Sequence, residues 1–280
     1  MRILLTGAGG QLGSAVRAQF GRHELFARSH AELDVAVPVA VGAALDELRP
    51  ELVLNAAAYT AVDRAEDEPE AAARGNEVGP RVLAELTAPR GIALLHVSTD
   101  YVFDGEKGTP YVEGDPVHPI SVYGASKLAG EEAVRRANPR HYIARTAWLY
   151  GPVGTNFALS IRAAAARGAG LRVVDDQWGS PSYAPHLAAA LARLIETQAF
   201  GTHHLANAGV ASRFEFAEAL LAALGSPARV EPIPTSAWPT RARRPRNSAL
   251  TSERGTGIDL PHWREGVRAF AAALRPAATD

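Results

Sequence analysis

The sequence predicts an α/β protein: a doubly wound parallel sheet covered by helices on both faces, and a smaller C-terminal α/β lobe. Up to Gly151, short apolar runs typical of buried strands alternate with amphipathic helical patterns. The first apolar run passes directly into a glycine-rich turn and then into a helix. Beyond Gly151 this alternation loosens. We therefore expect residues 1–151, completed by parts of 182–225, to form the sheet domain, and residues 152–280 to form mainly a second lobe.

The composition limits the classes of protein to which the chain belongs. Its 280 residues are enough to bury a large core, and its formal net charge of −1 gives no electrostatic footprint for nucleic acid or an anionic membrane. Cysteine is absent, which excludes disulfides and thiolate chemistry. No stretch approaches the ~18 consecutive apolar residues of a membrane helix. We expect a cytoplasmic protein, monomeric or homodimeric, without nucleic-acid or membrane partners.

The glycine-rich turn follows the first expected strand, Arg2 to Thr6. Gly7, Gly10 and Gly13 have the spacing G-x-x-G-x-x-G, and a helical pattern begins immediately afterwards. Such glycines allow a tight turn, a close backbone approach to a pyrophosphate and close packing of helix on strand. A purely structural turn between strand and helix is the alternative. The order of strand, turn and helix favours a Rossmann-type dinucleotide site.

The second strand, expected over residues 24–27, ends without an acidic residue. Arg28 and Ser29 stand where an Asp or Glu would bind the ribose and reject a 2′-phosphate. This pattern favours NADPH and leaves NADH open. Asp34 lies a few residues further on, where it could approach the adenine, although a role as a helix or turn cap explains it equally well.

The next two strands place small and polar residues at the same edge of the sheet. Residues 51–55 form one expected strand, and alanines follow it at 56–58, where a flat ligand can approach closely. Residues 92–98 form the other, and Thr99 and Asp100 stand at its carboxyl end. We expect the Thr99 hydroxyl to donate to a substrate oxygen.

A tyrosine and a lysine follow on the next expected helix. Tyr123 and Lys127 are four residues apart, so on a helix both side chains project from one face. Lowering a tyrosine pKa from about 10 to about 7 requires about 4 kcal/mol. An ammonium ~4 Å away, at an effective dielectric of about 20, supplies that order of energy. We therefore predict that Tyr123 exchanges protons near neutral pH, a chance match on a solvated helix face being the alternative.

The use of lysine strengthens this interpretation. The chain has 27 arginines and only two lysines, Lys107 and Lys127. A chain that uses arginine for almost every other cation but keeps lysine one turn after Tyr123 indicates that a compact ammonium is needed there.

Two further charged segments have local explanations. Asp63 and Glu66 lie in an acid-rich helix start, which we interpret as capping and dipole complementarity, and Asn76 in the following helix as structural. Residues 241–246 contain four arginines, which favours binding of a pyrophosphate group, with a solvated loop as the alternative. The histidines show no metal-ligand spacing.

With these pieces placed, the chain resembles the extended short-chain dehydrogenase/reductase superfamily and, within it, the dTDP-4-dehydrorhamnose reductase family. The resemblance rests on motifs that occur in family order from end to end. They are G-A-G-G-Q-L-G at 7–13, N-A-A-A-Y-T-A-V-D at 55–63, S-T-D-Y-V-F-D-G at 98–105, V-Y-G-A-S-K-L-A-G-E at 122–131, R-T-A-W-L-Y-G at 145–151, D-D-Q-W-G-S-P at 175–181 and A-R-R-P-R-N-S at 242–248.

The resemblance implies NAD(P)H-dependent reduction of the C4 keto group of dTDP-4-dehydro-6-deoxy-L-mannose. It assigns catalysis to Tyr123, Lys127 and Thr99. Cofactor binding is assigned to Gly7, Gly10, Gln11, Leu12, Gly13, Arg28, Asp34, Val35, Ala57, Ala58, Tyr59, Thr60, Tyr123 and Lys127, and substrate binding to Thr99, Asp100, Tyr101, Trp148, Asn156 and Arg244. The alternatives are an epimerase or dehydratase of the same superfamily and a non-catalytic NADP-binding subunit. Some family members bind a bridging magnesium through a glutamate on the first helix, but Ser14 to Arg17 here contain none, so we expect no metal.

Overall fold

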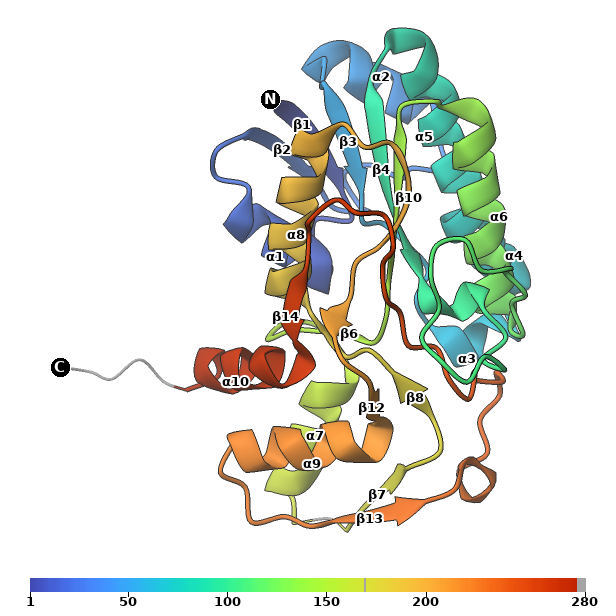
Figure 1. The fold of residues 1–280 in the computed structure, drawn as a ribbon. Coiled ribbons are helices and arrows are strands. Elements are labelled where there is room, and N and C mark those ends of the chain that lie inside the picture. Colours follow the sequence, from blue (N-terminus) through green and yellow to red (C-terminus); the bar gives the residue numbers. More distant parts are fainter. Residues whose placement is uncertain (169, 276–280) are drawn as a thin grey trace, which may run out of the picture.

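A six-stranded parallel sheet forms the centre of the computed structural model, which describes residues 1–168 and 170–275 (Figure 1). Its spatial order is β2-β1-β3-β4-β5-β10, and every neighbouring pair is parallel. The strands are β1 (Arg2–Thr6), β2 (Glu24–Arg28), β3 (Leu52–Asn55), β4 (Ala93–Thr99), β5 (His141–Thr146) and β10 (Gly201–His204). The strand order reverses at β1, which has β2 on one side and β3 on the other. The predicted doubly wound parallel sheet is confirmed.

Helices cover both faces of this sheet because successive strand residues point to opposite sides. Ile3 and Leu5 of β1 belong to the core beneath α1 (Gln11–Gln19) and α8 (Ala184–Thr197), whereas Leu4 belongs to the core on the other face. That second face carries α2 (Pro38–Leu48), α5 (Gly79–Thr87) and α6 (Val122–Ala137) (Figure 1). The connection from β3 to α5 contains the short helices α3 (Val62–Ala65) and α4 (Pro69–Ala73) and a π-helix, η1 (Arg74–Val78). The 3-10 turns η2 (Ala88–Arg90) and η3 (Asp100–Val102) flank β4.

A smaller lobe lies beyond one end of the sheet (Figure 1). Its own apolar core includes Tyr150, Phe216 and Trp263 and is separate from the two sheet cores. Its main elements are α7 (Phe157–Ala166), β7 (Leu171–Val174), α9 (Arg213–Ala223), β13 (Val230–Ile233) and α10 (Trp263–Ala273). Short strands complete it: β6 (Leu149–Tyr150), β8 (Trp178–Gly179), β9 (Ser182–Tyr183), β11 (Asn207–Ala208), β12 (Ala211–Ser212) and β14 (Leu260–His262).

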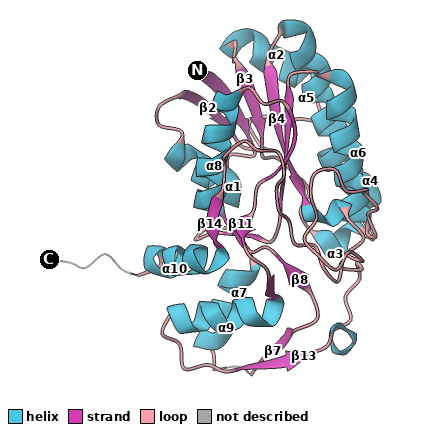
Figure 2. Cartoon of the chain, viewed as in Figure 1, coloured by secondary structure: helices cyan, strands magenta, loops and turns pink. Residues whose placement is uncertain are grey.

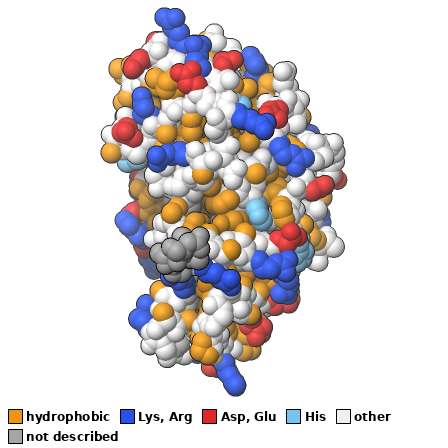
Figure 3. Space-filling model, turned by 90° about the vertical axis from the view of Figure 1, so that its left-hand side faces the viewer, with side chains coloured by type: hydrophobic (Ala, Val, Ile, Leu, Met, Phe, Trp, Pro, Cys, Tyr) orange, Lys and Arg blue, Asp and Glu red, His pale blue; other side chains and the backbone are white. Residues whose placement is uncertain are grey.

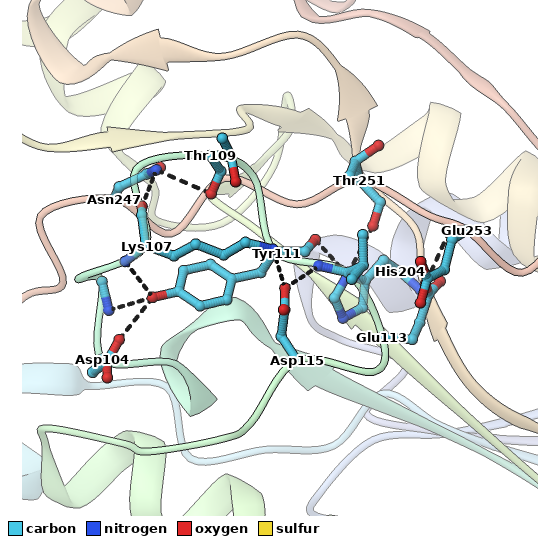
Figure 4. Close-up of polar contacts among 12 residues, drawn as sticks. Asp104, Lys107, Thr109, Tyr111, Glu113, Asp115, His204, Asn247, Thr251 and Glu253 are labelled. Atoms are coloured by element: carbon cyan, nitrogen blue, oxygen red, sulfur yellow. Dashed lines mark hydrogen bonds and ion pairs between the residues drawn. The ribbon is translucent and has the colours of Figure 1, made fainter.

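The connection from β13 to β14 is mostly loop, containing only the 3-10 turn η4 (Thr235–Ala237) (Figure 2). A polar cluster ties part of it to the loop between β4 and α6 (Figure 4). In this cluster the Tyr111 hydroxyl donates to Asp104 at 2.7 Å, and the Asn247 amide donates to the Lys107 carbonyl at 2.8 Å. Lys107, the second lysine of the chain, pairs with Asp115. The cluster holds residues 247–253 beside the carboxyl end of β4.

On the face that Figure 3 shows, no large patch of the surface carries charges of one sign only. Lys and Arg side chains are interspersed there with Asp and Glu. Among the residues that the structure describes, no helix combines the length and the apolar composition needed to cross a membrane.

Candidate active site

The carboxyl ends of β1, β3, β4 and β5 open into one cavity of about 820 Å³ that reaches the smaller lobe. All of the predicted site residues line this cavity except Gly13, Arg28 and Arg244. A second cavity, of about 650 Å³, lies around Arg2, Arg49 and Arg140 and contains none of the predicted site residues. The polar side chains at the strand ends and the expected dinucleotide turn thus share one space, as sheets of this type favour.

The glycine turn has no room for side chains at two of its positions. Gly7 has a positive φ of +72°, and a Cβ placed there would lie 2.5 Å from the Ala57 nitrogen. A Cβ on Gly13 would lie 2.3 Å from the Gly7 carbonyl oxygen, so Gly13 lets α1 pack on the turn without itself lining the cavity. Gly10 occupies the N-cap position of α1, and no side chain there accepts hydrogen bonds from the first N–H groups of the helix. The first N–H groups of this helix are therefore available to a phosphate.

We expect Gly13→Ala to destabilise the protein by about 1–3 kcal/mol, because the new methyl group meets backbone atoms that cannot move aside cheaply. The midpoint of urea unfolding at constant slope measures the change. Gly9→Ala is the matched control in the same turn, since a Cβ there meets nothing within 4 Å. Equal midpoints for the two variants would show that the close packing of α1 on the turn is unimportant.

Glycine also determines where α6 begins. Ser121 caps the helix by accepting a hydrogen bond from the Gly124 N–H at 3.1 Å. A Cβ on Gly124 would lie 2.2 Å from the Tyr101 carbonyl oxygen, so only glycine lets the helix rest on the chain after β4. As a result the Tyr123 ring meets Tyr101 edge-on, with the ring centroids 5.8 Å apart. The start of α6 thus delivers Tyr123 to the end of β4.

Buried polar contacts hold α6 in this position. The Asn76 amide donates to the Ser126 hydroxyl at 3.0 Å and to the Tyr59 carbonyl, which supports the structural interpretation of Asn76. Further along the helix, fully buried Glu131 accepts from Arg145 of β5 at 2.7 Å and from the Ser98 hydroxyl. A buried charge pair of this kind positions its elements, because each charge is unfavourable without the other.

Lys127 and Tyr123 both line the cavity, but their electrostatics differ from the prediction. Burial raises the pKa of Tyr123, and a hydrogen bond with Thr99 only partly opposes this effect. The Lys127 ammonium donates to the Val97 carbonyl at 2.7 Å, and burial lowers the pKa of Lys127 to about 8. The prediction that Tyr123 has a lowered pKa is therefore wrong, because the loss of water around a buried phenolate outweighs any attraction from the lysine. Tyr123 is instead a protonated phenol at neutral pH.

Thr99 and Asp100 form a buried pair at the end of β4. The Thr99 hydroxyl donates to the Asp100 carboxylate at 3.0 Å and accepts from the Tyr101 N–H. Asp100 also accepts from the Ser248 hydroxyl, and burial raises the pKa of this carboxyl group to about 6. Ser248, the last residue of the A-R-R-P-R-N-S motif, is thus the link from that motif to the site.

Trp148 and Asn156 form the side of the cavity that belongs to the smaller lobe. Trp148 has a left-handed backbone, with φ +45°, and its indole lies against Gly179, where a Cβ would be 2.3 Å from the ring. Asn156 caps α7 and donates to the Gln11 side chain at 2.8 Å. Gln11 therefore joins the glycine turn to the smaller lobe.

Asp34 lines the cavity and caps a turn, the local role considered from the sequence. Its carboxylate accepts from the Ala36 N–H at 2.9 Å and pairs at 2.6 Å with Arg74, which also lines the cavity. Arg28 does not line the cavity. Its guanidinium donates to the Ala27 carbonyl at 3.2 Å, and His30 and Arg74 occupy the wall where Arg28 was expected.

The arginine-rich segment is also placed differently from the prediction. Arg244 forms a two-pronged pair with Asp63, with both N–O distances 2.6 Å, and Arg241 pairs with Asp67. The Arg244 guanidinium lowers the pKa of Asp63 to about 2. Asp63 therefore does not cap its helix, and the Arg244 charge is already compensated outside the cavity.

Sequence reasoning missed several polar residues of the cavity wall, among them Arg213 and Thr146. The Arg213 guanidinium lies 3.5 Å from the centre of the Trp148 ring. Thr146 ends β5, and its buried hydroxyl has no hydrogen-bond partner among the described residues. The capping box that places Arg213 first in α9, Ser212 with Glu215, predicts a helix start but gives no sign of a cavity.

A doubly wound sheet with a glycine turn and a Tyr–Lys pair at its carboxyl edge defines an oxidoreductase of the short-chain dehydrogenase/reductase class. The match to a family model is more specific. Residues 1–275 match the model described as RmlD substrate binding domain, and the chain belongs to this family.

Relatives of known name agree with this assignment. The chain is 41% identical to a dTDP-4-dehydrorhamnose reductase of Mycolicibacterium smegmatis, covering 100% of this chain and 88% of the relative. It is 42% identical to a Streptomyces antibioticus protein named "Probable dTDP-4,6-dihydroxy-2-methyloxan-3-one 4-ketoreductase", covering 96% and 94%. Among solved structures, the dTDP-4-dehydrorhamnose reductase of Bacillus anthracis in complex with NADP superimposes with a TM-score of 0.95 at 35% identity, covering 97% of this chain and 99% of that one.

Proposed function

We propose that the protein is a dTDP-4-dehydrorhamnose reductase that uses NADPH, and less readily NADH, to reduce the C4 keto group of dTDP-4-dehydro-6-deoxy-L-mannose. The product is dTDP-L-rhamnose. One observation carries the proposal: Tyr123, Thr99 and Lys127 meet the glycine turn in a single cavity whose other side is formed by a lobe with its own core.

The cavity wall fits a dinucleotide on two grounds. Gly7 and Gly10 leave the backbone of the turn open, with the uncapped start of α1 beside it. Thr146 carries a buried hydroxyl without a partner in the described part of the chain, and a buried hydroxyl normally has one. Gly10, Gln11 and Leu12 would hold the pyrophosphate, and Ala57, Ala58, Tyr59 and Thr60 the middle of the cofactor. NADPH, when bound, supplies the hydride that reduces the keto carbon.

The chain supplies the proton and the binding energy. Tyr123 is protonated at neutral pH, so its hydroxyl can donate to the oxygen of the reduced carbon, because an alkoxide is a much stronger base than a phenolate. Lys127 has a pKa of about 8, close to neutral pH, and its ammonium form stabilises the Tyr123 phenolate that remains. Thr99 would bind the same oxygen once its hydroxyl proton turns from Asp100 to the substrate. Trp148 packs against the sugar.

The division of the chain follows from this assignment. Residues 1–151, with parts of 182–225, would bind the cofactor, which the packing of α8 and β10 onto the sheet supports. Residues 152–280 would mainly hold the sugar nucleotide. The proposal places the reaction in the cytoplasm, with a monomer or homodimer as the working assembly.

An absorbance assay of NADPH oxidation with enzymatically prepared dTDP-4-dehydro-6-deoxy-L-mannose tests this function. We expect one NADPH consumed for each dTDP-L-rhamnose formed, and slower turnover with NADH. An epimerase or dehydratase would convert sugar nucleotide without net consumption of NADPH, and a regulatory subunit would bind NADPH without turnover. Either result would refute the proposal.

A further inference from the structure

Arg213 carries a positive charge into the cavity and forms no ion pair there among the described residues. It is the first residue of α9, and it lines the cavity together with Tyr123 and Trp148. None of the ion pairs within 4 Å in the described part of the chain includes Arg213. Burial lowers the pKa of Arg213, and the neighbouring Tyr101 and Asp100 partly oppose this effect. Arg213 is half-buried, and a charge partly removed from water without an ion pair is unfavourable, so its position requires an explanation.

The nearest acid, Asp100, is already engaged. One of its oxygens accepts from Thr99 and the other from Ser248. By contrast, the arginines expected from the sequence to bind a pyrophosphate, Arg241 and Arg244, are each paired with an aspartate. Arg213 thus lines the substrate side of the cavity without an ion pair of its own, in a position to meet an anion.

The surroundings of Arg213 hold its guanidinium in place. One face lies over the Trp148 indole at 3.5 Å, and the Phe157 ring centre is 5.4 Å away. Trp148 is itself fixed by its left-handed backbone and by contact with Gly179. A guanidinium stacked on a fixed ring presents its N–H edge beside the ring, where Tyr101 is one neighbour, and this edge matches phosphate oxygens in a forked geometry.

We propose that Arg213 binds the diphosphate of the nucleoside diphosphate sugar. This inference rests on the proposed function, because it takes the sugar to lie between Tyr123 and Trp148. The diphosphate then extends from the sugar into the smaller lobe, where Arg213 opens α9 and the helix dipole also favours an anion.

Calorimetric titration of the NADP-saturated protein with dTDP tests the inference. Arg213→Gln should weaken dTDP binding by roughly 10- to 100-fold, the usual effect of removing a charged hydrogen bond. The affinity for NADPH should change by less than about 2-fold, since the variant leaves the glycine turn intact. Arg162→Gln, which removes an exposed arginine of α7, is the matched control and should leave both affinities unchanged.

Unchanged dTDP affinity in Arg213→Gln would overturn the inference. If Arg213→Gln also loses NADPH binding, the Arg213→Lys variant decides, because lysine keeps the charge but not the forked N–H geometry. Normal NADPH binding with weaker dTDP binding in Arg213→Lys would support the diphosphate contact. Unchanged dTDP binding in Arg213→Lys would overturn it. The proposed reaction fails separately. Absence of turnover by the wild-type protein, with dTDP affinity still lost in Arg213→Gln, would refute the reductase but not the diphosphate contact.

Discussion

Replacing Tyr123 with Phe is expected to lower kcat by roughly 10³-fold, within the range of about 10²–10⁴ for loss of a general acid. The Phe ring keeps the edge-on contact with Tyr101, whereas the hydroxyl beside Thr99 is lost. Proton donation to the alkoxide then falls to water. The affinity for NADPH should change by less than about 2-fold, because the interaction removed acts in the transition state. Steady-state NADPH oxidation and a fluorescence titration with NADPH measure the two quantities.

Tyr142→Phe is the matched control. Tyr142 is a buried tyrosine of β5 that packs in the core beneath α1 and α8 and does not line the cavity. It should keep near-normal kcat. If Tyr123→Phe also retained near-normal kcat, Tyr123 would not be the acid, and a water or the Thr99 hydroxyl would have to deliver the proton.

Lys127→Met should produce the second large effect, a loss of activity of at least about 10²-fold together with a gain in stability. Burial lowers the pKa of Lys127 from 10.5 to about 8, so the folded protein binds the Lys127 proton less tightly than the unfolded chain. The contribution of Lys127 to the free energy of unfolding of the wild type is therefore fully present above pH 10.5, the pKa in the unfolded chain. It is lost as the pH falls through 8, the pKa in the folded protein. At pH 7 we expect Lys127→Met to be more stable by about 1–2 kcal/mol, and this difference should shrink as the pH rises toward 10.

Urea unfolding of both proteins at pH 7 and pH 10 measures this prediction. Lys107→Met is the control, because Lys107 is the other lysine and pairs with Asp115 away from the cavity. Its removal should not stabilise the protein at pH 7. A Lys127→Met variant that is less stable than wild type at both pH values, by the same amount, would show that burial of this ammonium is not unfavourable.

The parts of the fold and site that sequence predicts are those that depend on neighbours in the chain. The strand, turn and helix from Arg2 to Gln19 follow from local apolar periodicity and from Gly7 and Gly13, where a side chain would meet backbone atoms. Tyr123 and Lys127 share a face of α6 because they are four residues apart. The family resemblance adds the residues of the family's motifs, most of which do line the cavity.

Pairings between distant residues were beyond sequence reasoning. Asp63 pairs with Arg244, 181 residues away, and this contact takes a predicted phosphate ligand out of the cavity. Arg213 lies over Trp148 because α9 begins beside the cavity, which no pattern around position 213 indicates. The electrostatics of Tyr123 depend on how much water the folded chain excludes, and sequence spacing contains no measure of that.

Transfer of deuterium is the most direct test of hydride delivery to C4 within the cavity that holds Tyr123. The protein would be incubated with dTDP-4-dehydro-6-deoxy-L-mannose and NADPH that carries deuterium at both positions of the nicotinamide C4, and the product examined by proton NMR. We predict a single deuterium at C4 of the sugar, with the configuration of L-rhamnose. A product without deuterium at C4, or one with the opposite C4 configuration, would contradict the orientation of cofactor, sugar and Tyr123 on which the proposed function depends.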